Sequence, residues 1–454
     1  MRTTTLSFMM VLAARLALGR SADAEPEPFH APVPAVADPM LAPPPEAAIR
    51  MGSWDEALAL IRAQSPDYVS SSESVVRAEA QKRIALAAVL PVLNGQASYV
   101  HQFSTTTVSL SPTASFVTPP PDLVTVGATL GWAAVNPRGI YGLGTADRNV
   151  ELARLSFADR RRAIAVAVVA SMLTTLAAAR VAELNRIGLR AALERLALVQ
   201  TRQQFGQGTA LDVDRAHQDV EASRALIISS DESLRQSREA LGVALGSPLA
   251  VAAPGDLELE QFEAAVARTC RLNDEIERRP DVRAARLRVD VAERAVRDAE
   301  LQLAPSLNVS SQLSYASEAV LGPKALWSVQ GVLTVPFYDG GVRYGAMRDA
   351  RAAVEQARQA LLSARLDAIV GAAQAQRAVG VLQSSRDVAR QQRELAQRID
   401  QRTRDGYAQG LGTSLDMVIS AQALRQAETS LALLEFQVGQ ARATAVLTNA
   451  ECVY

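Results

Sequence analysis

In three segments of the chain, apolar side chains alternate with polar or small ones. The apolar positions are Val124, Val126, Leu130 and Trp132 in the first segment, Leu307, Val309 and Leu313 in the second, and Trp327, Val329 and Leu333 in the third. This period of two predicts strands with one apolar and one polar face. A fourth segment, the expected partner of the first, alternates less well. We therefore expect four strands, at about 95–109, 123–136, 306–316 and 326–336.

Long proline-free stretches predict unusually long helices. No proline occurs between Pro137 and Pro248, and none follows Pro336. Each stretch is interrupted once, by a glycine-rich segment at 205–209 or 407–413. A helix, a tight turn and a returning helix are predicted in each stretch. The outgoing helices, at about 145–205 and 342–406, would each have about 60 residues and a length of about 90 Å.

The two halves of the chain repeat one pattern. Pro66 and Pro280 each begin a short helical segment, Pro91 and Pro305 each follow its end, and both pairs are separated by 214 residues. We expect these short helices at about 67–90 and 281–304, and the returning helices at about 211–245 and 415–449. A short and a returning helix together match the length of one outgoing helix. They can therefore stack end to end beside it and form a wall of nearly uniform height.

Composition agrees with long packed helices. Hydrophobic residues make up 48% of the 454 residues, but aromatic residues only 4%. The net charge of −1 gives no electrostatic reason to expect nucleic-acid binding. Cys270 and Cys452 are the only cysteines. In an oxidising compartment they either pair or stay as buried thiols, and the sequence leaves both alternatives open.

The N-terminus resembles a secretory signal. Arg2 precedes an apolar stretch from Leu6 to Ala14, and small residues at 22–24 favour cleavage before Glu25. Eight prolines between Glu25 and Pro45 exclude a helix or a central strand, which predicts a flexible or extended leader. The expected divisions of the chain are a signal peptide (1–24), a leader (25–52), a first repeat (53–247), an inter-repeat linker (248–275), a second repeat (276–450) and a C-terminal tail (451–454).

Two tandem copies of short helix, strand pair, long helix, glycine turn and returning helix resemble the TolC-like outer-membrane efflux proteins. The resemblance covers about 54–449, and its most specific motif is Val-Pro-Phe-Tyr-Asp-Gly-Gly at 335–341. The corresponding first-half segment, 133–139, matches it poorly. The resemblance implies a mainly α-helical fold with membrane β-strands. In that fold three chains close a twelve-stranded β-barrel on top of an α-helical periplasmic tunnel.

The same resemblance implies a passive exit duct in the outer membrane, used for efflux or type I secretion. Its expected partners are two further copies of the chain, a periplasmic adaptor, an inner-membrane efflux transporter and outer-membrane lipid, with no nucleic acid. We do not expect an enzyme, a cofactor or a metal site. His30, His101 and His217 have no partner at metal or triad spacing, and the glycines at 142–144 and 410–412 complete no phosphate-binding loop.

Two other interpretations compete with this one. A soluble periplasmic coiled-coil adaptor or scaffold shares the long hairpins but leaves the strand pairs unexplained. The apolar stretch 163–179, preceded by three arginines, is typical of an inner-membrane helix but lies at the short limit for a span. The corresponding second-half stretch carries Arg365, Asp367 and Arg377. Packing within the helical wall is therefore expected for both stretches.

Three sets of candidate functional residues follow. The ten apolar strand residues named above are expected to face lipid. The hairpin tips are expected to dock the adaptor through Gly206, Gly208, Thr209, Gly410, Leu411, Gly412 and Thr413. Asp400 and Asp405 are expected to form an acidic ring at the tunnel entrance of a trimer. The alternative is that both pair with Arg402 and Arg404 on the outside of the tunnel.

Overall fold

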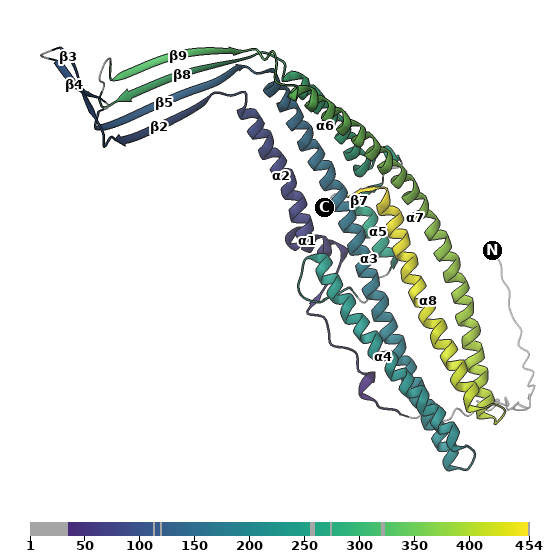
Figure 1. Cartoon of the computed structure of the whole chain (residues 1–454). Helices are drawn as coiled ribbons and strands as arrows, with labels where there is room; N and C mark the ends of the chain where they lie inside the picture. The colour runs from purple at the N-terminus through teal and green to yellow at the C-terminus, as the bar shows by residue number, and fades with distance from the viewer. Residues whose placement is uncertain are drawn as a thin grey trace, which may run out of the picture.

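The computed structural model describes residues 35–111, 114–118, 120–254, 259–272, 275–318 and 323–452. The expected signal peptide and the first part of the leader lie outside these ranges, as do the last two residues of the tail. Within them, a sheet extends from one end of a long curved layer of helices (Figure 1).

The helical layer follows the expected pattern of two repeats. Its helices are α2 (Pro66–Ala87), α3 (Pro137–Gln204), α4 (Ala210–Leu245), α6 (Pro280–Leu301), α7 (Val342–Ala408) and α8 (Ser414–Thr448). α2 and α4 pack along α3, while α6 and α8 lie between α3 and α7 and contact both. In Figure 1, α2 and α7 lie at opposite edges of the upper part of this layer. The short and returning helices therefore stack beside the long ones, as the lengths predicted.

Proline and glycine define the joints of this layer. Pro66 and Pro280 occupy the first turns of α2 and α6, where a missing backbone N–H costs no hydrogen bond. Gly246 ends α4 in the left-handed conformation, with φ of 84°. A Cβ on Gly246 would lie 2.4 Å from the carbonyl oxygen of Gln64, so only glycine fits where α4 meets the start of α2.

α3 begins earlier than the sequence indicated. It starts at Pro137 rather than near Thr145, because the Asn136 side chain caps it by accepting a hydrogen bond from the Gly139 N–H at 2.9 Å. Gly142 and Gly144 lie inside this helix. At Gly144 the guanidinium of Arg294 approaches so closely that a Cβ would lie 2.6 Å from Nη2. Glycine there permits contact between α3 and α6.

The main sheet has the strand order β2-β5-β8-β9, and every neighbouring pair is antiparallel. The strands are β2 (Val92–His101), β5 (Asp122–Val135), β8 (Ser306–Ala316) and β9 (Ala325–Thr334). The last three lie within about two residues of the expected bounds. β2 and β9 are the edge strands of this sheet.

The expectation of one strand at 95–109 was wrong in its second part. β2 ends at His101, and the following segment forms a separate hairpin of β3 (Thr106–Ser111) and β4 (Ala114–Thr118). The chain leaves the sheet where Gln102 N–H bonds to the carbonyl of Pro121 at 2.8 Å. Residues 104–107 are all Ser or Thr, so no apolar alternation extends the face of β2.

The inter-repeat linker is a structured element. With the chain near both termini it forms what we term the equatorial layer, which packs against the middle of α3. Its parts are α1 (Trp54–Gln64), α5 (Leu259–Thr269), the parallel pair β1 (Ile49–Arg50) and β6 (Val251–Ala252), and the antiparallel pair β7 (Cys270–Leu272) and β10 (Ala450–Cys452). Cys270 and Cys452 form a disulfide in that last pair, which resolves the alternative left open by the sequence.

The described part of the leader is held against the helices. In this segment, residues 35–52, Asp38 caps the 3-10 helix η1 (Pro39–Leu41) and accepts a hydrogen bond from Arg224 of α4 at 2.8 Å. Arg186 and Arg238 donate to the carbonyls of Ala42 and Pro45 at 3.0 and 2.8 Å. The Arg224 guanidinium holds the pKa of Asp38 below its usual range. The leader therefore joins α3 to α4 along the lower part of the wall.

The apolar stretch 163–179 lies in α3, which among the described residues is the one helix long and apolar enough to cross a membrane. Its apolar side chains instead form the largest part of the main core, including Ile164, Val168, Val169, Met172 and Leu173. They pack against α1, α5 and the ends of α4 and α8. Packing within the wall, rather than an inner-membrane span, accounts for this stretch.

Candidate functional site

The strand register places all ten predicted lipid-facing residues on one face of the sheet. Residues directly opposite each other share a face, and Val126 pairs with Tyr315, Trp132 with Val309, and Leu313 with Trp327. A bulge between Ala133 and Val135 brings Leu307 opposite Val135, so the apolar set continues past the irregularity. Leu93 and Tyr99 of β2 also lie on this face. They were not predicted, because β2 alternates only weakly.

The opposite face of the sheet is mainly polar, with apolar exceptions that include Val100, Leu326 and Val332 on its two edge strands. It carries Asn94, Gln96, Ser98, Thr125, Thr129, Asn308, Ser310, Gln312, Ser328 and Gln330. The hydroxyls of Ser98 and Thr125 lie 2.6 Å apart across two strands. On the apolar face, the hydroxyl of Ser311 is paired, since it accepts a hydrogen bond from Trp327 Nε1 at 2.9 Å. The sheet thus separates an apolar surface from a water-compatible one.

Aromatic side chains flank the apolar face at both ends. Tyr99 and Tyr315 lie toward the loops, while Trp132 and the exposed Phe337 and Tyr338 lie toward the helices. From the position opposite Tyr99 to Trp132, β5 spans about 26 Å at about 3.3 Å per residue. This length matches the apolar band of an outer-membrane barrel, and aromatic belts are typical of its two interfaces.

The two hairpin tips have the same turn chemistry. Gly206 and Gly410 adopt φ of 72° and 79°, which reverses the chain after each outgoing helix. Thr209 and Thr413 cap the returning helices, each in a reciprocal capping box with the acidic residue three positions later. Leu411 projects from the second tip with 82% of its surface exposed. The sequence prediction for these turns is confirmed in its structural part.

The tips are also bonded to each other. Arg202 of α3 donates to the carbonyl of Tyr407 at 2.5 Å, and its guanidinium lies 4.4 Å from the centre of the Tyr407 ring. Ser414 donates a hydrogen bond to the carboxylate of Asp212, the acidic residue of the capping box at the start of α4. That bond, with those from Thr209, lowers the pKa of Asp212 despite partial burial. The carboxylate therefore stays charged in neutral solution and fixes both tips.

The two carboxylates of the expected entrance ring lie in different surroundings. Asp400 is buried and accepts hydrogen bonds from Arg404 at 2.7 Å and from Ser420 of α8 at 3.1 Å. Asp405 is exposed and bonds to the amide of Gln401 at 3.2 Å. The Asp400–Arg404 pair corresponds to the sequence-based alternative. Asp405 is the carboxylate that faces solvent.

A buried charge cluster, absent from the sequence prediction, joins the two repeats above the tips. Asp219 of α4, 2% exposed, binds Arg195 of α3 at 2.5 Å and Arg425 of α8 at 2.8 Å. Arg425 also donates to the Ser223 hydroxyl at 2.7 Å. Burial alone would raise the pKa of Asp219, but the two guanidiniums outweigh it and the pKa is lowered. Three helices are therefore held by one carboxylate.

A glycine makes this cluster geometrically possible. Arg425 reaches α4 by crossing α3 at Gly188, where a Cβ would lie 2.5 Å from its side-chain carbon Cδ. The sequence offered one signal for this cluster. Asp219 lies between Ala216 and Val220 of α4, which are both buried, so helical spacing places an acidic residue in the core. Its two partners, far away in sequence, were not predictable from spacing.

The described residues contain no group of three or more His, Cys, Asp or Glu side chains arranged to hold a metal ion. His101 pairs with Asp122 at 2.7 Å, and His217 is exposed on α4. His30 lies outside the described ranges. The geometry instead defines a class of protein: a four-stranded sheet with one apolar face, attached to a long helical wall whose hairpin tips are bonded together.

Comparison with known proteins identifies this class further. Residues 272–447 match the model of the outer membrane efflux protein family. The chain is 26% identical over 278 residues to the pyoverdine export outer membrane protein OpmQ of Pseudomonas putida, a match that covers 60% of this chain and 57% of OpmQ. The chain therefore matches less than two thirds of the length of that relative.

Solved structures share the whole fold. A membrane protein from Pseudomonas aeruginosa superposes with a TM-score of 0.73 at 20% identity, covering 92% of this chain and 99% of that one. The outer membrane protein VceC from Vibrio cholerae gives 0.68 at 17% identity, covering 87% and 95%. The resemblance to TolC-like outer-membrane efflux proteins is confirmed, in sequence for the second repeat and in fold for nearly the whole chain.

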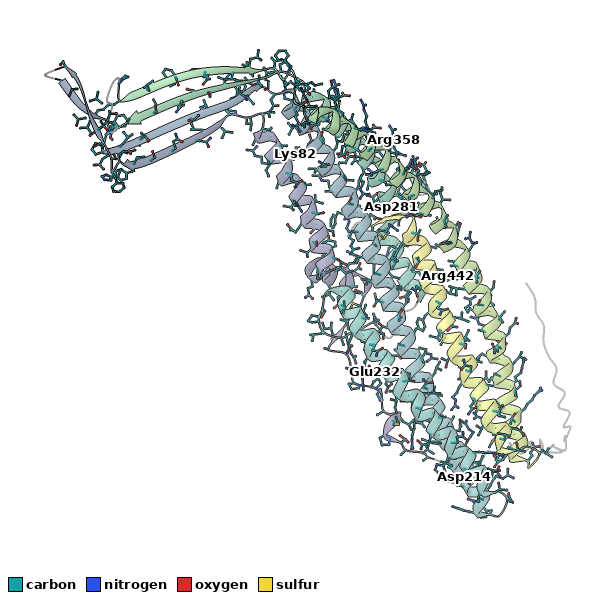
Figure 2. The ribbon with its side chains drawn as sticks, viewed as in Figure 1. Lys82, Asp214, Glu232, Asp281, Arg358 and Arg442 are labelled. Carbon is teal, nitrogen blue, oxygen red and sulfur yellow. A yellow bond between two sulfur atoms is a disulfide. The ribbon has the colours of Figure 1, made fainter. Side chains whose placement is uncertain are left out.

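The charge cluster generates a prediction. Asp219→Asn should lower the free energy of unfolding by about 3 kcal/mol, because it leaves the buried Arg195 and the partly buried Arg425 without a counter-charge. Asp214→Asn, a change at an exposed position on the same helix (Figure 2), should cost less than about 0.5 kcal/mol. Urea unfolding of the detergent-solubilised protein measures both changes.

The stability difference between the wild type and Asp219→Asn should depend on pH in a defined direction. Because the pKa of Asp219 is lowered by folding, its stabilising effect is present above the unfolded pKa of about 4 and disappears as pH falls through the folded value. The gap between the wild type and Asp219→Asn should therefore close in acid. Equal stabilities of the two variants at neutral pH would contradict the assigned role of the cluster.

Proposed function

We propose that this protein is a subunit of a trimeric outer-membrane channel, which provides a passive exit duct for efflux or type I secretion. Its sheet joins the sheets of two further copies in a β-barrel, and its helical wall joins theirs in a periplasmic tunnel. A periplasmic adaptor connects the tunnel to an inner-membrane transporter, which supplies the energy.

The proposal rests on the open edges of the four-stranded sheet. In lipid, backbone polar groups have no water to bond, so a spanning sheet must close on itself. β2 and β9 leave one edge each unpaired, and four strands are too few to close a barrel. β9 runs antiparallel to β8, and β2 runs antiparallel to β5. β9 of one copy therefore fits antiparallel to β2 of the next, and three copies supply the twelve strands that the family resemblance implies.

The helical wall has unpartnered edges at the same two sides. On α7, Val381, Val388 and Leu395 recur every seven residues and are each more than half exposed. α2 carries a similar stripe with Val69 and Val76. Repeats of seven are typical of coiled-coil seams that pack against another helix. Because the stripes lie on opposite edges of the chain, they favour a head-to-tail ring rather than a two-fold dimer.

The apolar face of the sheet indicates where the ring sits. Three such faces would form a lipid-facing band bordered by aromatic residues, and the Ser, Thr, Asn and Gln face would line the pore. The soluble adaptor or scaffold interpretation assigns no environment to this face. We therefore favour an outer-membrane location with the helices in the periplasm.

The assignment of alternate strand residues to a lipid-facing and a pore-facing side generates a prediction. Leu313→Arg should reduce barrel assembly by about 2 to 4 kcal/mol, because Leu313 lies opposite Ala128, midway along the lipid-facing band. Gln312→Arg, one residue away on the polar face, should assemble normally. The yield of heat-modifiable trimers in outer-membrane fractions measures the difference. Equal yields of the two variants would reject the assigned faces.

The second tip generates another prediction, about adaptor docking. Gly412 has an ordinary φ and a Cβ there would meet its nearest atom at 3.4 Å, so Gly412→Asp fits the turn. The added charge and bulk should block close packing against an adaptor, and the loss multiplies over the tips of a trimer. Export should therefore be abolished while trimers remain in the outer membrane.

Three measurements define the outcome. Ethidium efflux in cells lacking other efflux channels measures export, outer-membrane fractionation measures assembly, and Gly412→Ala is the uncharged control. Gly410→Ala should instead damage the fold, because Gly410 has φ of 79°. If Gly412→Asp trimers assemble and still export at the wild-type rate, adaptor docking at this tip is rejected.

A further inference from the structure

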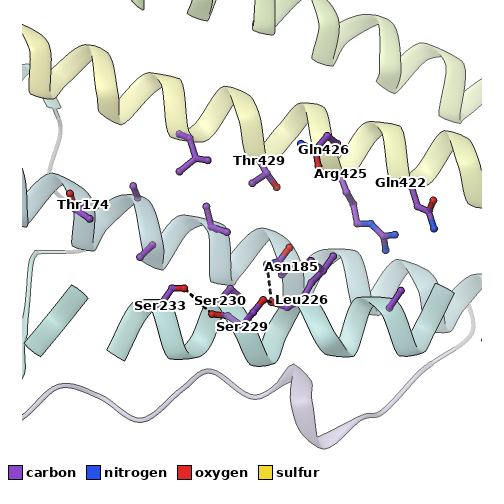
Figure 3. Close-up of a pocket in the computed structure, with 15 residues that line it drawn as sticks. Thr174, Asn185, Leu226, Ser229, Ser230, Ser233, Gln422, Arg425, Gln426 and Thr429 are labelled. Carbon is purple, nitrogen blue, oxygen red and sulfur yellow. Dashed lines mark hydrogen bonds between the residues drawn. The ribbon is translucent and has the colours of Figure 1, made fainter. Parts of the chain in front are cut away.

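A groove of about 560 Å³ lies between α3, α4 and α8 (Figure 3). Its walls are mixed. Val181, Leu226 and Leu433 provide apolar surface, while Gln426, Thr429 and Arg425 approach from α8. The side chains of Gln426 and Thr429 have no hydrogen-bond partner among the described residues, so their donors are available to a ligand.

The groove lies on the side of the wall opposite the equatorial layer. Met172 of α3 packs into the core that this layer shares with the wall, and Val181 lines the groove. These residues are two and a half helical turns apart, so they point in opposite directions. In the proposed duct, three equatorial layers facing inward would obstruct the tunnel. The layers therefore lie outside, and the groove opens to the lumen.

The charge around the groove is positive. Arg195 and Arg425 share the single carboxylate of Asp219, and the neighbouring Asp400 is already paired with Arg404. None of the residues that line the groove, all within the described ranges, is acidic. One positive charge is therefore left uncompensated beside a partly apolar cavity. Low-dielectric walls strengthen its field at the mouth of the groove.

We infer that this groove is a lumenal binding site for amphipathic organic anions. The apolar part of such a molecule packs against Val181, Leu226 and Leu433. Its anionic group faces Arg425 and accepts hydrogen bonds from Thr429 and Gln426. This inference rests on the proposed duct for its lumenal position, but the groove itself is formed within one chain. A site of this kind would concentrate anionic solutes in the tunnel.

The test uses a matched pair of variants and a matched pair of probes. Detergent-solubilised full-length protein is titrated by calorimetry with naphthalene-1-sulfonate and with 1-naphthylmethylammonium. The sulfonate should bind the wild type at least about tenfold more tightly than the ammonium does, because the excess charge is positive. Thr429→Glu should bind the sulfonate at least about tenfold more weakly than Thr429→Gln, whose side chain has the same size as that of Glu but carries no charge. Equal sulfonate affinities of the two variants, or equal affinities of the two probes, would overturn the inference.

Planar-bilayer recordings of the same preparations separate this inference from the duct. Stepwise pores blocked by the sulfonate in the wild type and in Thr429→Gln, but not in Thr429→Glu, support both. Pores without sulfonate binding reject the groove alone. Sulfonate binding without pores rejects the lumenal position, and the absence of both rejects the site together with the duct.

Discussion

The unpaired edges of the four-stranded sheet are the constraint on which the proposed architecture depends. A backbone N–H or C=O exposed to hydrocarbon costs several kcal/mol, and β2 and β9 each present a row of them. A single chain has no means of pairing them. In the proposed duct, assembly is therefore required, and the apolar stripes on α2 and α7 would extend the same head-to-tail contact down the helical wall.

The helical wall in turn is held rigid within a chain by two kinds of contact. Rigidity comes from the equatorial layer, which packs the ends of α4 and α8 against the middle of α3 and carries the Cys270–Cys452 disulfide. Nearer the tips, a second apolar cluster that includes Leu189, Val199 and Met417 is joined by buried charges. Asp219, Asp212 and Asp400 each join two or more helices there. Such polar contacts are specific in geometry, and they fix the region that would meet an adaptor in the proposed duct.

Much of this fold was predictable because it repeats. The separation of 214 residues between matching prolines located both short helices, and alternation located three of the four strands of the main sheet. The hairpin of β3 and β4 was missed because its Ser- and Thr-rich start carries no alternation. The equatorial layer was missed because its parts come from both sides of the first repeat and from the C-terminus. Pairings such as Asp219 with Arg425 depend on Gly188 opening a path across α3, which no local spacing reveals.

Closure of the sheet by three copies is the central claim, and an electron cryomicroscopy map of the full-length protein in lipid nanodiscs tests it most directly. We predict three chains around one axis, with β9 of each chain paired to β2 of the next and Val309, Leu313 and Trp327 toward lipid. The equatorial layers should surround the tunnel on its outside. A single chain with unpaired strand edges, or a ring whose apolar sheet face lines the pore, would contradict the proposed duct.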